Sequence, residues 1–304
     1  MKYTFLLPTF KATYFREALE SIKNQTYRDF KVIVSDDCSP EGKQLKQIYE
    51  AVADVRFTFR RNTENMGSKS LVSHWNLLVD LCDTDYLIMA SDDDVYESTF
   101  LEEINRLVEK YPDCDLFRGR VQFIDDKGNT LNKDNLMPEY ENNIEFLRSH
   151  FSDGNLKCIA NHVFCTNILR DKGGFEETPL AWYSDQITAI KGSSNGCANT
   201  PNVVFNFRMS DQNISGRKPT KRVASLKAKA TMQADRWFSK YLQENNIKDF
   251  QYKRWGKQIY YWLMNADFKT YISLLPEIIR YGLWDKKWME AITRHQIKML
   301  LTNG

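Results

Sequence analysis

The 304-residue sequence lacks the compositional marks of several specialised protein classes. Its 13 glycines and 8 prolines form no repeat, which excludes a collagen-like chain. Its six cysteines include no Cys-x-x-Cys pair, which argues against a zinc ribbon or redox dithiol and favours free thiols in a reducing compartment. No stretch approaches the roughly 18 apolar residues that a membrane-spanning helix needs. The apolar run before Pro8 is too short for a signal peptide, so we expect a cytoplasmic protein.

An excess of charge of one sign is missing as well. The 42 Lys and Arg residues nearly balance the 40 Asp and Glu residues, and the net charge of +2 argues against a protein that coats nucleic acid. Hydrophobic residues make up 42% of the chain and charged residues 27%, as in ordinary soluble proteins, which excludes a disordered chain. The length allows one large domain, or one domain with an appendage.

The first 125 residues alternate between strand and helix patterns. Short apolar runs typical of strands occur at residues 3–7, 31–34, 55–59 and 86–90. Between these runs, apolar residues recur at helical spacing, for example over residues 71–81. The rhythm predicts an α/β fold, with a mostly parallel sheet covered by helices on both faces.

The pattern changes in the rest of the chain. We expect further strands at residues 116–124, 158–166 and 202–208, with short helices between them. Beyond Gly216 strand patterns are absent, and the chain is typical of several helices rich in Trp and Tyr. These features predict a domain over residues 1–216 and a helical C-terminal region over residues 217–304.

Polar clusters follow three of the expected strands, where ligands bind in open α/β sheets. The clusters are Pro8-Thr9, Ser35-Asp36-Asp37-Cys38-Ser39 and Ser91-Asp92-Asp93-Asp94-Val95. Crowded carboxylates repel one another unless a cation or a donor-rich ligand neutralises them. A divalent ion that carries a diphosphate would do so. The alternative is an acidic turn that caps the helix beginning near Ser98.

The order and spacing of these clusters resemble those of glycosyltransferase family 2, whose members have the GT-A fold. The segments that carry the resemblance are Leu6-Leu7-Pro8-Thr9-Phe10-Lys11, Ser21-Ile22-Lys23-Asn24-Gln25-Thr26-Tyr27, Val34-Ser35-Asp36-Asp37-Cys38-Ser39, Asn65-Met66-Gly67 and Ser91-Asp92-Asp93-Asp94. A looser likeness continues through Gly173-Gly174-Phe175-Glu176, Tyr183-Ser184-Asp185-Gln186 and Phe207-Arg208-Met209-Ser210. The likeness covers roughly residues 3–216 and leaves the C-terminal helices unexplained.

The chain departs from the family pattern at a few positions. Ser91 stands where the family has its first acid of the Asp-x-Asp region, and Ser184 stands where it has Glu. Cys38 replaces a glycine, and Ser210 replaces a closing histidine. These departures put the register of the three acids Asp92, Asp93 and Asp94 in question.

The resemblance implies a nucleotide-sugar-binding half over about residues 1–96 and an acceptor half over about residues 97–216. It implies that Asp37 binds the base, that Asp93 binds Mn²⁺ or Mg²⁺, and that Asp92 shares the ion or the nucleotide. The other donor-binding residues that it implies are Pro8, Thr9, Asp36, Asn65, Gly67, Asp94 and Arg208. An alternative role for Asp36 is that of a turn carboxylate before Ser39 and Pro40.

The resemblance also implies that Asp185 is the general base. Inverting transfer needs a carboxylate on the side of the anomeric carbon opposite the leaving diphosphate, where it takes the proton of the acceptor hydroxyl. The alternative is that Asp185 caps the helix that follows it. His162 and Trp182 are candidates for the acceptor side, whereas His74, beside Trp75 in a helix, is expected to be structural.

We therefore expect a metal-dependent inverting glycosyltransferase that moves a sugar from a nucleoside-diphosphate sugar, in the first place a UDP-sugar, to a hydroxyl of a glycan or lipid-linked saccharide. Such reactions build cell-surface polysaccharides. A catalytically inactive relative that binds nucleotide or glycan as an assembly partner is the main alternative. A sugar nucleotidyltransferase is disfavoured, because Pro8-Thr9-Phe10-Lys11 contains no glycine to cradle phosphates.

The near-zero net charge conceals an asymmetry. Residues 1–216 hold 24 basic and 33 acidic residues, whereas residues 217–304 hold 18 basic and 7 acidic residues. The basic region either packs on the acidic domain, forms a homodimer, or meets an anionic membrane surface at the inner face of the cell membrane. Nucleic acid is a further, disfavoured partner. The residues expected at a membrane are Lys253, Arg254, Trp255, Lys257, Tyr260, Tyr261, Trp262, Trp284, Lys286, Lys287 and Trp288.

Overall fold

The computed structural model describes residues 2–152, 154–210, 219–247 and 254–302. The chain divides into two compact units. The first unit consists of Met1–Glu176 and Thr188–Gly216, and the second consists of Glu177–Ile187 and Arg217–Gly304. A short segment from the middle of the chain therefore belongs with the C-terminal helices.

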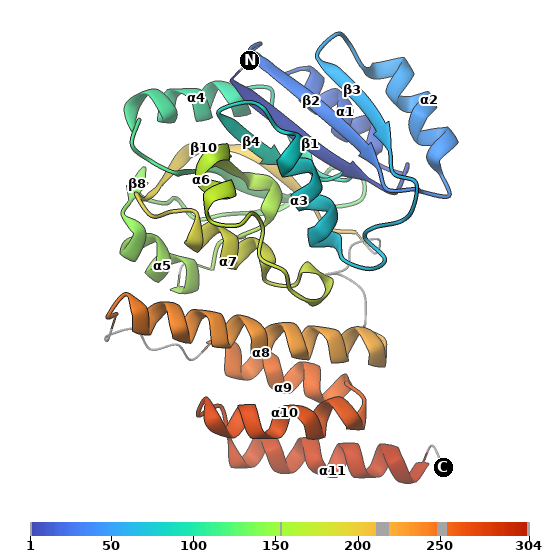
Figure 1. Ribbon diagram of the computed structural model, residues 1–304, viewed down its shortest axis with the longest axis vertical. Coiled ribbons are helices and arrows are strands. Elements are labelled where there is room, and N and C mark those ends of the chain that lie inside the picture. The colour runs from blue at the N-terminus through green and yellow to red at the C-terminus, as the bar shows by residue number, and fades with distance from the viewer. Residues whose placement is uncertain (1, 153, 211–218, 248–253, 303–304) are drawn as a thin grey trace. The chain divides into compact units, whose positions relative to one another are not determined.

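A mixed, mostly parallel sheet forms the centre of the first unit (Figure 1). Its main strands, in spatial order, are β3 (Phe57–Arg61), β2 (Phe30–Asp36), β1 (Tyr3–Thr9), β4 (Tyr86–Met89), β9 (His162–Cys165), β6 (Leu116–Ile124), β10 (Cys197–Arg208) and β5 (Val95–Tyr96). The strands from β3 to β4 are parallel, β9 runs antiparallel to both its neighbours, and β10 is parallel to β6. Two short strands complete the sheet, β7 (Thr130–Lys133) beside β6 and β8 (Tyr140–Glu141) beside β10.

Helices α1 to α7 occur between the strands along the chain, and the boundary between the two units falls within α7. Their bounds are α1 (Phe15–Lys23), α2 (Gly42–Val52), α3 (Leu71–Leu81), α4 (Phe100–Lys110), α5 (Asn143–Ser152), α6 (Thr166–Asp171) and α7 (Ser184–Lys191), with 3-10 helices at Ile159–Asn161 and Pro179–Ala181. Tyr3, Phe5 and Leu7 of β1 lie in one apolar core with residues of α1, α2 and α4. Thr4 and Leu6 point to the opposite face and are also buried, and α3 packs against β1. The α/β fold class predicted from the sequence is confirmed.

Two strand predictions need correction. The strand expected from residue 55 begins at Phe57, because Asp54 forms a turn in which its carboxylate accepts from the Arg56 N–H at 3.0 Å, leaving Val55 exposed. The strand expected over 158–166 begins with a 3-10 turn, because the Asn161 side chain donates to the Gly119 carbonyl at 3.0 Å and bends the chain before β9. All six cysteines are free thiols, as expected.

The second unit is helical. Its elements are α8 (Lys221–Glu244), α9 (Arg254–Asn265), α10 (Phe268–Arg280), α11 (Lys286–Thr302) and the 3-10 helix at Pro179–Ala181. The core of the unit includes Met232 of α8, Leu263 of α9, Ile278 of α10 and Ile292 of α11. None of the helices in the described ranges has both the length and the hydropathy that crossing a bilayer requires.

Candidate active site

The three polar clusters of the sequence lie at one edge of the sheet, at the carboxyl ends of β1, β2 and β4. Thr9 pairs with Asp36 in the register of β1 and β2, and Leu6 pairs with Met89 of β4. The Asp37 N–H donates to the Thr9 carbonyl at 3.0 Å, so the backbone bonding continues past the ends of the strands. This edge is where ligands bind in open α/β sheets.

Asp92 fastens the segment after β1 to the segment after β4. Its Oδ2 atom accepts hydrogen bonds from Thr9 Oγ1 at 3.2 Å, from the Phe10 N–H at 2.8 Å and from the Lys11 N–H at 3.0 Å. Among the described residues, none donates to the other oxygen, Oδ1. Asp92 therefore connects the ends of β1 and β4 through Oδ2 alone.

Asp94 is held within the protein. It is buried, and its Oδ1 accepts from the Arg208 N–H at 2.8 Å, while its Oδ2 accepts from the Ser91 hydroxyl. Burial, together with the charge of Asp93, raises the pKa of Asp94. The expected contact of Asp94 with the donor thus needs correction, because one of its oxygens is bonded to β10 and the other to Ser91 within the loop. Ser91, at the position of the missing family acid, is one of its partners.

Asp93 lies between these two carboxylates and is partly exposed. Burial and the charge of Asp92 raise the pKa of Asp93, while the cationic groups of Lys11 and Arg208 lower it. Carboxylates that resist ionisation because of their neighbours are stabilised by a cation. The three acids therefore form a locally anionic edge, at which Asp93 is partly exposed and does not hold neighbouring segments together through its side chain.

The carboxylates at this edge fit a divalent ion that takes most of its ligands from a bound nucleotide and from water. No group of three or more His, Cys, Asp or Glu side chains in the described ranges could hold a metal alone. Mg²⁺-type sites in nucleotide enzymes use one or two carboxylates, with phosphate oxygens and water as the other ligands. Asp93 and the Oδ1 atom of Asp92 match that pattern.

Asp37 organises the loop that contains Asn65-Met66-Gly67. Its Oδ1 atom accepts from Asn62 Nδ2 at 2.8 Å and from the Met66 N–H at 2.9 Å, and its Oδ2 accepts from the Gly67 N–H at 2.7 Å. A Cβ atom on Gly67 would lie 3.0 Å from Asp37 Oδ2, so a side chain there would press on the carboxylate. The contact of Asp37 with a base stays a prediction, since its charge already serves this loop.

Asp36 and Cys38 flank Asp37 and are structural. Asp36 is buried, forms an ion pair with Arg61, and accepts from the Ser39 N–H at 2.8 Å, as the turn interpretation expects. No sequence motif indicates Arg61 as this partner, although the register of β2 and β3 places it opposite Asp36. Cys38 has a left-handed φ of 55°, which explains why the family uses glycine there.

Arg208 is enclosed, which corrects its expected contact with a diphosphate. Its side chain is 1% exposed, with Nε donating to the Asp93 carbonyl at 2.9 Å and Nη2 pairing with Glu17 at 2.7 Å. The ring of Tyr14 covers the guanidinium at 4.4 Å. Arg208 therefore ties β10 to the acidic loop and to α1, and Glu17 is a partner that the motifs did not reveal.

His162 has no exposed surface through which an acceptor could touch it. The residue is 0% exposed, and its Nδ1 atom lies 2.7 Å from the Cys158 carbonyl. Burial, with the charge of Arg118 opposite it on β6, lowers the pKa of His162 to about 3, so the ring is neutral. His74 is also buried, with Nε2 at 2.9 Å from Ser35 Oγ.

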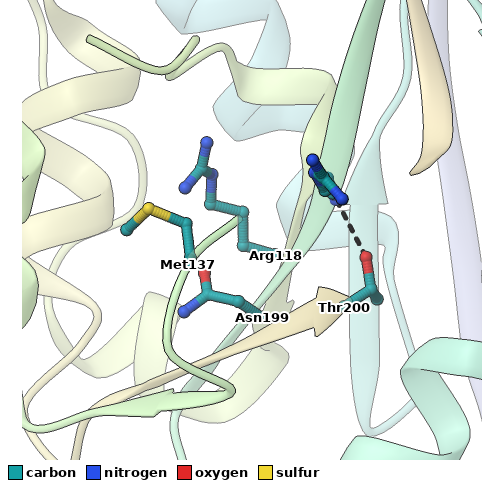
Figure 2. A pocket seen from close by; sticks show the side chains of 5 residues that line it. Arg118, Met137, Asn199 and Thr200 are labelled. Carbon is teal, nitrogen blue, oxygen red and sulfur yellow. Dashed lines mark hydrogen bonds between the residues drawn. The ribbon is translucent and has the colours of Figure 1, made fainter. Parts of the chain in front are cut away.

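A narrow pocket lies beside β6 and β10 (Figure 2). Its lining residues are Arg118, Arg120, Met137, Asn199 and Thr200. Arg118 is paired with Asp134 at 2.8 Å, and the Arg120 N–H donates to Thr200 Oγ1 at 2.9 Å. These contacts engage much of the polar lining within the protein, although Arg118 Nε has no hydrogen-bond partner among the described residues.

The segment Gly173-Gly174-Phe175 is fixed to α3 by Asn76. The Phe175 N–H donates to Asn76 Oδ1 at 2.7 Å, and Asn76 Nδ2 donates back to the Phe175 carbonyl at 3.0 Å. Gly173 and Gly174 have left-handed φ values of 83° and 73°. A Cβ on Gly174 would lie 2.5 Å from Asn76 Oδ1, whereas Gly173 has open space around it. The double glycine thus serves a turn and a close contact.

Asp185 and Trp182 belong to the second unit, whereas the donor-side candidates and His162 belong to the first. Asp185 lies in the first turn of α7, where its Oδ1 accepts from the Gln186 N–H at 2.8 Å. Burial raises the pKa of Asp185 to about 7, the range in which a carboxylate can work as a general base. The aromatic ring of Trp182 faces the ammonium group of Lys227, at 3.8 Å from its centroid.

The strand order and the acidic edge match the GT-A fold, and comparisons with known proteins identify the family. The family model "Glycosyl transferase family 2" matches residues 4–172, more than half of the chain. The chain therefore belongs to glycosyltransferase family 2, which confirms the resemblance drawn from the motifs. The match ends before Asp185, so its role remains a prediction.

Curated relatives are also glycosyltransferases by name. The chain is 32% identical over 120 residues to an uncharacterised glycosyltransferase of Methanocaldococcus jannaschii, covering 39% of this chain and 40% of that protein. It is 30% identical over 117 residues to the putative colanic acid biosynthesis glycosyl transferase WcaA of Escherichia coli K12, covering 36% and 41%. The matches thus span about two fifths of these relatives.

Solved structures share the fold over most of the chain. TarS residues 1–349 of S. aureus, in complex with UDP-GlcNAc, superpose with a TM-score of 0.59 at 15% identity, covering 89% of this chain and 83% of that fragment. A mannosyltransferase of Pyrobaculum calidifontis, in complex with GDP-Man and Mn²⁺, gives a TM-score of 0.54 at 16% identity, covering 99% and 86%. At these identities the likeness shows the fold.

Proposed function

We propose that this glycosyltransferase is metal-dependent and inverting, and that it moves a sugar from a UDP-sugar to a hydroxyl of a glycan or lipid-linked saccharide during cell-surface polysaccharide synthesis. The binding of the nucleotide sugar is supported mainly by the anionic edge. There Asp92 connects the ends of β1 and β4, and Asp93 is partly exposed. The complexes of TarS with UDP-GlcNAc and of the mannosyltransferase with GDP-Man and Mn²⁺ support a nucleotide-sugar donor and a divalent ion. The colanic acid relative supports a polysaccharide product.

On the donor side, Asp93 and Oδ1 of Asp92 would hold Mn²⁺ or Mg²⁺. Such an ion neutralises the charge that develops on a leaving diphosphate. Thr9 and the loop that Asp37 fastens around Gly67 lie at the ends of β1 and β2 and would take the nucleoside. Asp94 and Arg208 act behind them, as internal fasteners of the acidic loop.

On the acceptor side, Asp185 accepts the proton of the attacking hydroxyl. As that oxygen bonds to the anomeric carbon, the bond from this carbon to the diphosphate oxygen breaks and the configuration inverts. A pKa raised to about 7 makes Asp185 a stronger base than an exposed aspartate, while part of it remains ionised at neutral pH.

The decisive experiment separates binding from transfer. Thermal-shift screening with UDP-, GDP-, CMP- and dTDP-sugars and Mn²⁺ identifies the donor, and product release with glycan acceptors then measures transfer. Asp185→Asn should abolish transfer and keep nucleotide binding, whereas the control Asp113→Asn, at an exposed acid, should leave both unchanged. Unchanged turnover in EDTA would remove the metal from the proposal, and unchanged turnover of Asp185→Asn would remove the base.

An inactive, nucleotide-binding relative is the second candidate. Serine stands at two family acid positions, and Ser184 is buried with no hydrogen-bond partner for its hydroxyl in the described part of the chain. This candidate predicts a thermal shift with a sugar nucleotide but no transfer or hydrolysis with any acceptor. Transfer above the background of Asp185→Asn would exclude it.

For the C-terminal region we propose a contact with an anionic membrane surface at its cytoplasmic side. Trp284 and Trp288 are 49% and 47% exposed and flank the exposed Lys286 and Lys287. Two expected contact residues, Tyr260 and Trp262, need correction, because they are buried in the helical core. Lys253 lies outside the described residues, as do the side chains of Arg254, Trp255 and Lys257.

Flotation with liposomes tests this contact. The protein should bind vesicles that contain anionic lipid, and Lys286→Gln with Lys287→Gln should weaken binding, as should high salt. Equal recovery on neutral and anionic vesicles would contradict the proposal. A mass of two chains in light scattering would instead support a homodimer, and a salt-sensitive shift with DNA or RNA would support nucleic acid.

A further inference from the structure

The segment before Asp185 has an unusual backbone. Five described residues other than glycine have a left-handed φ, and three of them lie in this segment. They are Leu180 at 59°, Ala181 at 54° and Tyr183 at 73°. This conformation is unfavourable for residues with a Cβ atom, so it persists only where surrounding contacts hold it.

The same segment carries buried polar atoms without a partner. The Thr178 hydroxyl, the Trp182 indole N–H and the Ser184 hydroxyl are each buried and make no hydrogen bond with any residue that the structure describes. Such groups destabilise a fold relative to their hydrated state. The left-handed backbone and the missing hydrogen bonds therefore both destabilise this segment. Contacts with other parts of the unit must hold it in place.

Lys227 of α8 contacts the segment at Trp182. Its side chain is 1% exposed, and its Nζ lies 3.8 Å from the ring centroid of Trp182 and 4.6 Å from that of Trp262 on α9. The two indole rings pack edge to face, with centroids 5.6 Å apart and an interplanar angle of 88°. An ammonium group that is shielded from water binds such rings more strongly than an exposed one.

Weaker contacts hold the two ends of the segment in the same unit. The Tyr183 hydroxyl donates to Gln258 Oε1 of α9, and Gln233 Nε2 of α8 donates to the Glu177 carbonyl. The Ile187 N–H donates to the Tyr183 carbonyl at 3.0 Å and so couples the segment to the first turn of α7. A displacement of Trp182 would therefore also move the first turn of α7, where Asp185 lies.

We propose that Lys227 is a positioning residue for Asp185, acting by clamping Trp182 against Trp262. The inference rests on the proposed role of Asp185 as the base. The proposal assigns a function to the C-terminal helices, because α8 and α9 hold the segment that precedes Asp185. It also revises the role of Trp182, whose ring is used by Lys227 and so is part of the clamp, not a platform for the acceptor.

Three variants of the full chain test the clamp. Lys227→Met keeps the length of the side chain and removes its charge, Lys227→Arg keeps the charge, and Lys229→Met is a control at an exposed lysine of the same helix. Hydrogen exchange of the peptide over residues 177–187 reports on the segment without any substrate. Binding of UDP with Mn²⁺ reports on the first unit, and turnover of the donor found by thermal-shift screening reports on transfer.

For Lys227→Met we expect about tenfold faster exchange in that peptide and about tenfold lower kcat, with UDP affinity unchanged. Lys227→Arg should recover most of both, and Lys229→Met should match the wild type. If Lys227→Met unfolds the protein, Trp262→Phe, which keeps a smaller ring, should give the same changes at reduced size.

Two results would overturn the clamp while leaving the proposed function intact. The first is wild-type exchange and kcat for Lys227→Met, and the second is an equal loss for Lys227→Arg, which would show that the charge is irrelevant. Full turnover of Asp185→Asn would instead remove the base, and with it the catalytic meaning of the clamp, whatever Lys227→Met does.

Discussion

Replacing Asp185 by asparagine should stabilise the protein at alkaline pH while it abolishes transfer. The carboxyl group has its pKa raised by burial to about 7, against an ordinary value of 3.8. Folding therefore favours the protonated form, which asparagine imitates in shape and in lack of charge. The substitution removes a charge that the native fold accommodates poorly.

The sign and size of the effect follow from proton linkage. Below pH 3.8 the carboxyl is protonated in both the folded and unfolded states, and its contribution to stability is fully present. Between pH 3.8 and about 7 the unfolded state loses this proton first, so the free energy of unfolding falls as the pH rises. At about 1.4 kcal/mol per pKa unit the full loss is about 4 kcal/mol. Because the side chain is only partly buried, we expect about 2 kcal/mol after screening by water.

Urea unfolding at a series of pH values measures this quantity. Six of the seven tryptophans lie in the second unit, so their fluorescence reports mainly on the unit that contains Asp185. The stability of Asp185→Asn relative to the wild type should increase by about 2 kcal/mol between pH 4 and pH 8. Glu244→Gln, at an exposed acid of the same unit, is the matched control and should show no such increase.

A flat difference between the two proteins across this pH range would refute the reasoning. It would show that the carboxyl titrates as an ordinary aspartate in the folded protein, and the argument that burial makes it a base of suitable strength would fail. A loss of transfer in the same variant would then have to come from geometry alone.

Four further substitutions test the first unit. Asp93→Ala should weaken UDP binding about tenfold with Mn²⁺ and leave it unchanged in EDTA, as measured by calorimetry. In Asp37→Asn, the new amide NH₂ group faces a hydrogen-bond donor of the loop, whichever way the side chain is turned. The substitution should therefore speed hydrogen exchange over residues 62–67 and lower the free energy of unfolding by about 2 kcal/mol. Gly174→Ala should lower the free energy of unfolding by about 3 kcal/mol and Gly173→Ala by about 1 kcal/mol, because both adopt a left-handed φ but only the first collides with Asn76.

The outcomes that would contradict these predictions are equally specific. A metal-independent loss of affinity in Asp93→Ala would mean that the residue contacts the nucleotide directly. Unchanged exchange in Asp37→Asn would show that the loop is held by other contacts. Equal destabilisation by the two alanine substitutions would remove the argument from the Asn76 contact.

The sheet and its acidic edge could be predicted because both depend on local pattern. Apolar runs give the strands, and a polar residue directly after a buried strand must lie at its carboxyl end, as Thr9, Asp37 and Asp92 do. The bounds of β6, Leu116–Ile124, agree with the run seen in the sequence. For these residues, short-range periodicity carries the information that the fold uses.

The partners of the charged side chains could not be predicted, because they depend on register and packing between distant segments. Arg208 finds Glu17 on α1, and Asp36 finds Arg61 on the neighbouring strand. His162 has no exposed surface because β9 lies between β4 and β6, an arrangement that no local pattern encodes. The grouping of Glu177–Ile187 with the C-terminal helices is of the same kind.

The grouping of Glu177–Ile187 with the C-terminal helices determines the order in which the two units can fold during synthesis. Synthesis runs from the N-terminus, and domains begin to fold as they emerge. The contacts of the acidic edge, up to Arg208, are complete before α8 exists, whereas Trp182 must wait for Lys227 and Trp262 to be made. On the proposed roles, a growing chain acquires the means to hold its sugar nucleotide first and the means to activate an acceptor last, so an unfinished chain cannot transfer sugar.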